Sequence, residues 1–266
     1  MRLDDDDRPI GRILSRREVL GLLGATGLAA ACAPAVLSGA SPTAAASAAP
    51  IATAAATAVA TTGGTVATPS CIVRPALTEG PYFVDEKLNR ADIRSDPSNG
   101  VVKPGLALAL TFNVSRVSSA GCVALQNAQV DVWHCDGLGV YSDASDPSFN
   151  TKGQKFLRGY QLTDGAGKAT FTTIYPGWYG GRAVHIHFKI RTTAAGGAVS
   201  DFTSQLFFDD ALNAQVFAQA PYSQKGSTGW MKNAQDGIYT GGGEKLLLKP
   251  TQTGSGYTAT FDIGLA

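Results

Sequence analysis

The chain has 266 residues and a formal net charge of +1, so its charge favours neither nucleic acid nor a strongly acidic partner. It contains no basic patch with interleaved aromatic residues, which argues further against nucleic-acid binding. Residues 34–69 consist almost wholly of Ala, Ser, Thr, Pro and Gly, and such a segment cannot bury enough apolar surface to fold. We therefore expect a disordered linker over 34–69 and one folded domain over 70–266.

Residues 1–33 have the features of an export signal. "SRREVL" at residues 15–20 is a twin-arginine pattern, and the apolar run that follows is too short and too rich in Ala and Gly to form a transmembrane span. Cys32, in "LAAAC", is either the lipidated first residue of the mature chain or a residue discarded near the cleavage site. We expect export by the twin-arginine route, to the periplasm, the extracellular medium or a membrane as an anchored lipoprotein.

Three cysteines follow the export signal: Cys71, Cys122 and Cys135. In an oxidising compartment, three cysteines are most simply arranged as one disulfide and one free thiol. We favour the pair Cys71–Cys122 because each residue flanks a predicted strand. Cys135 as a metal ligand is the alternative that stays open.

Short strand-like runs separated by turn signals begin near residue 105. They occupy 106–117, 128–135, 159–163, 168–174, 183–190, 204–209, 245–250 and 257–263. "DGAG" at 164–167 indicates a hairpin, because Gly supplies the positive φ that tight turns need, and a short helix is expected only at 211–218. The pattern predicts an all-β fold, a β-sandwich with long loops and little helix.

Two of the three histidines lie one residue apart in "RAVHIHFKI" at 182–190. Apolar and polar residues alternate through this run, so His185 and His187 share one face of a strand while Ile186 faces the core. Two imidazoles roughly 6–7 Å apart along a strand can converge on one metal ion. Two solvent-facing histidines are the alternative, and alternation alone does not separate these readings.

Two tyrosines follow glycine-rich or proline-containing turns near this strand in the expected fold. Tyr179 precedes His185 by six residues, and Tyr141 follows the strand and glycine loop in "VDVWHCDGLGVY". An ordinary surface tyrosine is the alternative for each of them taken alone. A Ser–His–Asp triad is poorly supported because the chain has no G-x-S-x-G motif, and Cys135 as a nucleophile would risk oxidation after export.

Seven motifs in order carry a resemblance to a known family. They are "TEGPYF" (78–83), "RADI" (90–93), "NAQVDVWHCDGLGVY" (127–141), "RGYQLTD" (158–164), "FTTIYPGWY" (171–179), "RAVHIHFKI" (182–190) and "QLFFD" (205–209). The chain resembles the intradiol ring-cleavage dioxygenases, of the catechol and protocatechuate 3,4-dioxygenase type, over essentially all of 70–266. The resemblance implies a β-sandwich of the intradiol dioxygenase type.

The resemblance also implies one mononuclear non-haem Fe(III) per chain. Its ligands would be two tyrosinates, Tyr141 and Tyr179, and two histidines, His185 and His187. Fe(III) is a hard cation, so phenolate oxygens suit it, whereas zinc gives no reason for paired tyrosines. A bound metal charge lowers the pKa of a phenol and makes tyrosinate available near neutral pH.

In the family reaction, both atoms of O₂ enter a catechol-type ring, which is cleaved between its two hydroxylated carbons to a cis,cis-muconate. By resemblance, the substrate displaces Tyr179, which then takes a substrate proton as general base. Arg182 matches an arginine that stabilises developing charge on the ring, and Gln205 matches a substrate-facing glutamine. Pro81 and Tyr82 would lie near the substrate mouth, with a purely structural turn as the alternative.

The chain departs from the classical enzymes at several positions. Only "GGRAV" separates Tyr179 from His185, which favours a more open pocket. Tyr175 is a rival for the displaced ligand, and the roles of His134 and Cys135 are open. A homo-oligomer is compatible with the sequence, although a low-complexity spacer replaces the helical segment through which catechol 1,2-dioxygenases dimerise. Two other functions stay under consideration: a secreted β-sandwich binding module that has lost catalysis, and a zinc-site protein.

Overall fold

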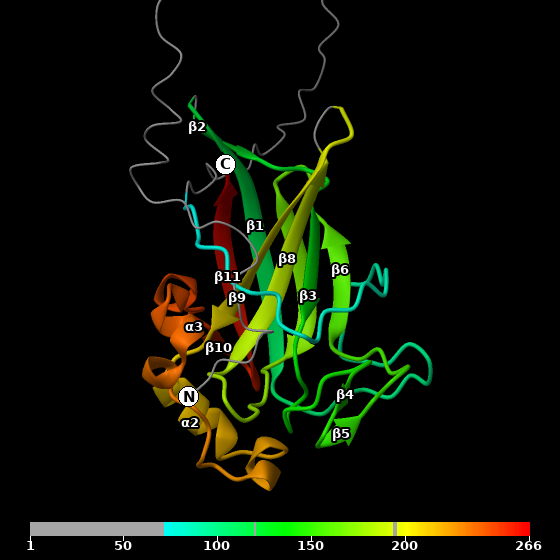
Figure 1. The fold of residues 1–266 in the computed structure, drawn as a ribbon, viewed down its shortest axis with the longest axis vertical. Helices are drawn as coiled ribbons and strands as arrows, with labels where there is room; N and C mark the ends of the chain where they lie inside the picture. The colour runs from blue at the N-terminus through cyan, green and yellow to red at the C-terminus, as the bar shows by residue number, and fades with distance from the viewer. Residues whose placement is uncertain (1–71, 120, 194–195) are drawn as a thin grey trace, which may run out of the picture. The chain divides into compact units, whose positions relative to one another are not determined.

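The computed structural model describes residues 72–119, 121–193 and 196–266 (Figure 1). The predicted export signal, linker and Cys71 lie outside the described residues. The described residues form two β-sheets with little helix, so the predicted β-sandwich is confirmed. Within them, no helix has the length and hydropathy needed to cross a bilayer.

The first sheet is organised around β1 (Ala107–Ser118). One edge of β1 pairs in parallel with β11 (Gly256–Leu265), which in turn pairs with the short β10 (Thr251–Thr253). The other edge pairs antiparallel with β7 (Lys168–Ile174) and then with β2 (Gly121–Ala124). The C-terminal strand therefore lies beside the first long strand of the domain.

The second sheet is antiparallel and has the order β6-β3-β8-β9. Its strands are β6 (Arg158–Leu162), β3 (Gln129–Trp133), β8 (His185–Thr193) and β9 (Val199–Phe207). A separate hairpin of β4 (Ser145–Asp146) and β5 (Phe149–Asn150) lies outside both sheets. Strand β8, which carries the paired histidines, is thus an inner strand with β3 on one side and β9 on the other.

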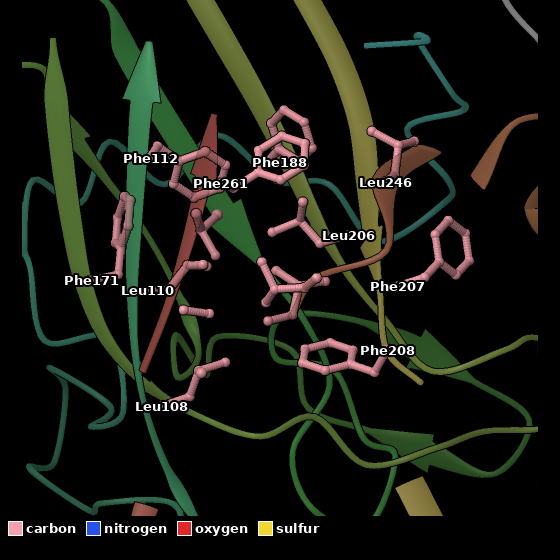
Figure 2. Packing of buried hydrophobic residues seen from close by; sticks show 14 of the residues in the cluster. Leu108, Leu110, Phe112, Phe171, Phe188, Leu206, Phe207, Phe208, Leu246 and Phe261 are labelled. Carbon is pink, nitrogen blue, oxygen red and sulfur yellow. The ribbon is translucent and has the colours of Figure 1, made fainter. Parts of the chain in front are cut away.

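Apolar side chains from the two sheets meet in one core (Figure 2). Phe112 of β1 packs against Phe188 of β8, with ring centroids 5.2 Å apart, and Phe261 of β11 lies 5.6 Å from Phe188. These aromatic side chains each remove a large apolar area from water, which is the main favourable term for folding. Ile186 and Ile190 are fully buried in the same cluster, as alternation along the strand predicts.

Helix is confined to short segments after β9. The predicted helix at 211–218 is confirmed as α2 (Asp210–Phe217), and the Asp209 carboxylate caps it by accepting from the N–H groups of Ala211 and Leu212. A single turn, α3 (Gly237–Thr240), follows, capped in the same way by Asp236. Three 3₁₀ turns, at Tyr222–Lys225, Asn233–Gln235 and Gly243–Leu246, complete this region and were not predicted.

Two strand predictions are wrong. The turn at 164–167 forms, with Gly167 N–H donating to Asp164 O at 2.9 Å, but it does not close a hairpin. Strand β6 pairs with β3 and β7 pairs with β1, so the turn crosses from one sheet to the other. The predicted strand at 245–250 is instead a 3₁₀ turn that ends in one bridge to β9. In both cases the pairing is decided by strands that are distant in the sequence. The local pattern of apolar and polar residues does not reveal such partners.

Two of the cysteines, Cys122 and Cys135, are among the described residues and are in different chemical states. Cys122 is disulfide-bonded, and Cys135 is a buried free thiol whose Sγ lies 3.6 Å from the Gly177 carbonyl oxygen. Because Cys71 lies outside the described residues, its pairing with Cys122 stays a prediction.

Candidate metal centre

His185 and His187 lie on the face of β8 that points away from the core, yet both are buried, at 2% and 1% exposure. The solvent-facing alternative is therefore wrong. The segment that contains Gly80 covers this face: a Cβ added at Gly80 would lie 3.2 Å from His187 Cε1, and its φ is +71°. Trp133 stacks on the His187 ring, with centroids 5.0 Å apart and planes 6° apart. Backbone and indole together hold the imidazole in place.

The two imidazoles point their Nε2 atoms at each other, 3.0 Å apart. His185 Nδ1 lies 2.6 Å from the Ala183 carbonyl oxygen, which can only accept, so the proton of neutral His185 is on Nδ1 and its Nε2 presents a lone pair. Burial, reinforced by the charge of Arg182, lowers the pKa of His185 to about 3. Burial and the neighbouring His185 also lower the pKa of His187 well below its usual value. Both rings are neutral, which is the form that binds a metal.

Two tyrosines complete this cluster. The Tyr179 hydroxyl lies 3.1 Å from His185 Nε2, and the Tyr141 hydroxyl is buried without a hydrogen-bond partner. The Tyr141 and Tyr179 rings meet edge to face, with centroids 5.6 Å apart. Burial is the main cause that raises the pKa of each phenol above its usual value, so without a bound metal ion both hydroxyls stay protonated.

Hydrogen bonding alone leaves this cluster poorly satisfied. His185 Nε2 has one lone pair but faces two neighbours, Tyr179 and His187. The Tyr141 hydroxyl faces the Tyr179 hydroxyl without a well-formed hydrogen bond, and His187 Nδ1 is buried without a partner. Buried polar atoms in native proteins are nearly always paired, and unpaired groups call for an explanation such as an ion. Two imidazole nitrogens and two phenol oxygens fit a hard transition-metal ion well.

The donor set is distinctive in its composition. Among the described residues, no group of three or more His, Cys, Asp and Glu side chains is placed to hold a metal. The neighbours of the histidine pair are instead tyrosines, which is unlike the ligand sets preferred by structural zinc. The assignment of these four residues as ligands stays a prediction.

Tyr175, the rival of Tyr179, lies elsewhere. Its hydroxyl donates to Asn213 Oδ1 at 2.7 Å, and its ring packs 4.4 Å from the ring of Phe208. Tyr175 is therefore buried between β7 and α2, while Tyr179 contacts His185. The structure separates two tyrosines that are only four residues apart in the sequence.

Arg182 is buried and held by two polar partners. Its Nε donates to Asp236 Oδ2 at 3.0 Å, and its Nη2 donates to Gln205 Oε1 at 2.6 Å. Gln205 in turn donates from Nε2 to the Thr78 carbonyl oxygen at 2.9 Å. Gln205 is also the register partner of His187, so the network lies beside the histidine pair. Two residues predicted from the sequence, Arg182 and Gln205, are thus directly bonded.

Sequence reasoning missed Asp236, which organises this network. Its Oδ2 accepts from Arg182 and from the Ala183 N–H, while its Oδ1 accepts from the Ile238 N–H at the start of α3. Burial alone would raise the pKa of the Asp236 carboxyl, but the Arg182 charge and these N–H groups outweigh it and lower the pKa. The one sequence signal is an Asp at a helix N-cap, which gives no hint of an arginine 54 residues away.

The predicted mouth residues behave differently from each other. Tyr82 stacks on Tyr141, with centroids 4.3 Å apart and planes 18° apart, and its hydroxyl donates to Asp146 Oδ2 at 2.9 Å. Pro81 is exposed and makes the turn before it. Tyr82 and Tyr179 line one pocket of about 440 Å³. The pocket thus borders Tyr179, one of the two tyrosines next to the histidine pair.

His134 and Cys135, whose roles were open, differ in surroundings: Cys135 packs in the same buried cluster as Tyr141 and Tyr179, whereas His134 bonds away from it. His134 Nε2 lies 2.6 Å from Thr173 Oγ1 and its Nδ1 lies 2.8 Å from the Cys135 carbonyl oxygen. Burial is the main cause that lowers the pKa of His134 to about 4. Both ring nitrogens are satisfied, so His134 links β3 to β7 across the sandwich.

Comparisons with known proteins identify the family. Residues 78–241 match the family model described as "Dioxygenase". An intradiol ring-cleavage dioxygenase from Tetranychus urticae has a similar structure, at 30% identity and a TM-score of 0.62, over 73% of this chain and 94% of that one. The dioxygenase domain of a dioxygenase–carbohydrate-binding fusion from Streptomyces sp. SirexAA-E is similar at 27% identity and a TM-score of 0.50, over 73% and 98%.

Among curated proteins, catechol 1,2-dioxygenase 2 from Acinetobacter lwoffii is 32% identical over 141 residues. The aligned part is 44% of this chain and spans 46%, about half, of that enzyme. The family match covers more than half of the chain and includes both histidines, both tyrosines and Arg182. The chain belongs to the intradiol ring-cleavage dioxygenase family.

Proposed function

We propose that the protein is a non-haem Fe(III) intradiol dioxygenase whose iron ligands are Tyr141, Tyr179, His185 and His187. The observation that carries this proposal is the convergence of the two histidine Nε2 atoms, 3.0 Å apart, with the Tyr179 hydroxyl 3.1 Å away. The unpaired Tyr141 hydroxyl beside them supplies the fourth donor. When bound, ferric iron supplies a hard acidic centre that favours the anionic forms of phenols and catechols.

The substrate class that fits is a catechol-type ring with O₂ as co-substrate. We propose that both oxygen atoms enter the ring, which opens between its hydroxylated carbons to a cis,cis-muconate. The pocket of about 440 Å³ exceeds the volume of a small aromatic ring, and Tyr82 and Phe149 give it aromatic walls.

Tyr179 is placed to move the substrate proton. It lines the pocket, and its hydroxyl lies 3.1 Å from His185 Nε2. Because burial raises the pKa of Tyr179, its phenolate would be a strong base toward a substrate hydroxyl. Tyr141 is enclosed beneath Tyr82, which favours the role of a ligand that stays in place.

Arg182 offsets negative charge at the site. Its guanidinium is fixed by Asp236 and Gln205, so it needs no rearrangement as charge develops on a substrate ring. Its charge acts on both phenols, opposing the effect of burial on the pKa of Tyr141 and Tyr179. Gln205 holds the guanidinium from the β9 side.

One experiment separates this proposal from a binding module and from a zinc site. The purified protein is loaded with iron or with zinc under identical conditions, and oxygen consumption is followed with catechol. The proposal predicts one iron per chain and oxygen uptake equal to the catechol consumed, with none for the zinc form. A protein that binds iron without consuming oxygen would be a binding module, and preferential uptake of zinc by the histidine pair would support the zinc site.

We further propose that the protein is exported by the twin-arginine route. The disulfide at Cys122 supports an oxidising compartment, since such bonds are rare in the cytosol. Cell fractionation with a twin-lysine variant (Arg16→Lys, Arg17→Lys) tests this, and retention in the cytosol is expected. Processing of the chain that is inhibited by globomycin would indicate a lipid anchor at Cys32 rather than a signal removed by cleavage. Sedimentation of the purified protein tests separately whether it forms a homo-oligomer.

A further inference from the structure

The pocket beside Tyr179 has one cationic side chain, which the reaction described above does not use. Among the described residues that line the pocket, Lys225 is the single lysine or arginine. It lies at the end of a 3₁₀ turn, 46 positions beyond Tyr179 in the sequence, and is brought to the pocket by the fold alone. Asp146, the one carboxylate in the lining, already accepts from Tyr82 and from Ser148.

The Lys225 ammonium is held in a fixed position. Its Nζ donates to the carbonyl oxygens of Leu138 and Trp178, at 2.8 Å each, and lies 4.6 Å from the centroid of the Trp178 ring. A Cβ at Gly139, whose φ is +83°, would collide with the Trp178 carbonyl and with the Lys225 ammonium. Gly139 therefore keeps open the space in which the ammonium sits.

This arrangement leaves part of the ammonium unused. An ammonium group has three N–H donors, and two of them are directed at the two carbonyl oxygens. Neither of these two partners carries a negative charge, and the effect of burial on the pKa of Lys225 outweighs that of the Asp136 charge, so the pKa is lowered. A partly buried ammonium that lines a pocket, with two N–H groups bonded to carbonyl oxygens and an aromatic face beside it, is suited to bind an anion through its third N–H.

We propose that Lys225 is a specificity-determining residue that binds a carboxylate substituent on the catechol ring. The inference rests on the proposed function, because it takes the pocket as the substrate site. It names the substrate class as catechols that carry an acidic ring substituent, with the carboxylate at Lys225 and the two hydroxyls toward Tyr179. The room in the pocket accommodates a ring with such a substituent.

A matched pair of substrates isolates the charge. 3,4-Dihydroxybenzoate and 3,4-dihydroxybenzamide have nearly the same size, but only the first is an anion. For the iron-loaded wild-type protein we expect kcat/KM to be about 10- to 100-fold higher for the benzoate, as a charge-assisted hydrogen bond in a partly buried site provides. Equal values for the two compounds overturn the inference.

Matched variants separate recognition from a structural role. Lys225→Met keeps the alkyl stem and removes the charge, so the benzoate preference should disappear while kcat/KM for the benzamide stays within a few-fold. Lys225→Arg should retain part of the preference, and Lys168→Met, an exposed lysine on β7, controls for net charge and should change nothing. If Lys225 only ties the two loops together, Lys225→Met lowers both kcat/KM values alike, and the inference is wrong.

Failure of the proposed function gives a different result. If the iron-loaded wild-type protein cleaves neither compound, the dioxygenase proposal fails, and Lys225 is then tested by binding alone. Calorimetry with the same two ligands, under nitrogen, should give a dissociation constant about tenfold or more lower for the benzoate, lost in Lys225→Met. Equal affinities, or a preference that survives in Lys225→Met, overturn the inference independently of catalysis.

Discussion

The two faces of β8 are both buried, but for different reasons. On one face Phe188 meets Phe112 and Phe261 of the opposite sheet, in a packed apolar core. On the other face His185 and His187 are covered by a stacked indole and a glycine-containing loop rather than by a sheet. Burial of the apolar face makes the free energy of folding more favourable, whereas burial of the polar nitrogens on the other face makes it less favourable.

The difference indicates what each face is for. The apolar side chains of the first face have no atoms that need hydrogen bonds. On the polar face, two neighbours compete for the one lone pair of His185 Nε2, and His187 Nδ1 has no hydrogen-bond partner. Lys189 continues the polar face and is compensated there, by an ion pair with Glu79 and by the face of the Phe83 ring. A metal ion bound by both Nε2 atoms would relieve the crowded lone pair of His185.

The largest expected effect is the loss of iron binding and activity when a histidine on the polar face of β8 is replaced. His185→Ala should abolish stoichiometric iron binding and lower kcat/KM for catechol by at least about 10³-fold, because it removes a proposed ligand. The free energy of unfolding of the metal-free protein should fall by only about 1–3 kcal/mol, because the Ala183 carbonyl oxygen loses the hydrogen bond from His185 Nδ1. Metal analysis and chemical denaturation measure the two quantities. Retention of full iron content would remove His185 from the ligand set.

The complementary change is Phe188→Ala on the apolar face. It should lower the free energy of unfolding by about 3–5 kcal/mol, because it leaves a cavity between the two sheets. At a temperature where the variant is folded, its iron content per chain should equal that of the wild type. Urea unfolding and metal analysis test this pair of outcomes. Loss of iron from fully folded Phe188→Ala would mean that the two faces are not independent.

A smaller effect is expected from the positioning of Arg182. Asp236→Asn keeps a side chain that can cap α3 but removes the charge that Arg182 contacts, so kcat should fall about 10- to 100-fold with KM changed less. Asp236→Glu should recover part of the loss because it restores the charge. Steady-state kinetics of iron-loaded variants, with melting temperatures as the folding control, provide the measurement. Equal losses in both variants would indicate a purely structural role for Asp236.

The smallest expected effect concerns pH and His134. Burial lowers the pKa of folded His134 to about 4, below the value of about 6.5 in an unfolded chain, so the unfolded state binds the proton first as pH falls. Stability is complete above pH 6.5 and is lost toward pH 4, at up to about 1.4 kcal/mol per pH unit for this group. Metal-free His134→Gln should show a shallower loss between pH 6.5 and 5 in urea unfolding. An unchanged dependence of the free energy of unfolding on pH would contradict the lowered pKa of His134.

The sequence predicted those features that depend on local periodicity. Alternation placed His185 and His187 on one face with Ile186 in the core, and the β-sandwich followed from the spacing of the strands. It was silent on whether the polar face is buried, because the covering groups, Gly80 and Trp133, come from distant segments. The "PGWY" motif, which fits the family pattern, favoured Tyr179 over Tyr175.

What sequence reasoning missed depends on contacts between distant segments. The turn at 164–167 has the residues of a hairpin, but β6 and β7 find better partners in different sheets. Asp236 and Lys225 lie in the 3₁₀-rich region after α2, where short turns give little periodic signal, and each reaches the site through a long-range hydrogen bond. Pairing and polar networks of this kind are tertiary properties, which a window of sequence does not contain.

The visible spectrum of the iron-loaded protein tests the central claim most directly. Coordination of Fe(III) by tyrosinate gives a charge-transfer band, so the wild-type protein should be wine-red. The band should weaken and shift in Tyr141→Phe and in Tyr179→Phe, and stay unchanged in Tyr175→Phe, whose hydroxyl bonds Asn213 instead. A colourless protein with one ferric ion per chain, or a band indifferent to both Tyr141→Phe and Tyr179→Phe, would contradict the proposed centre.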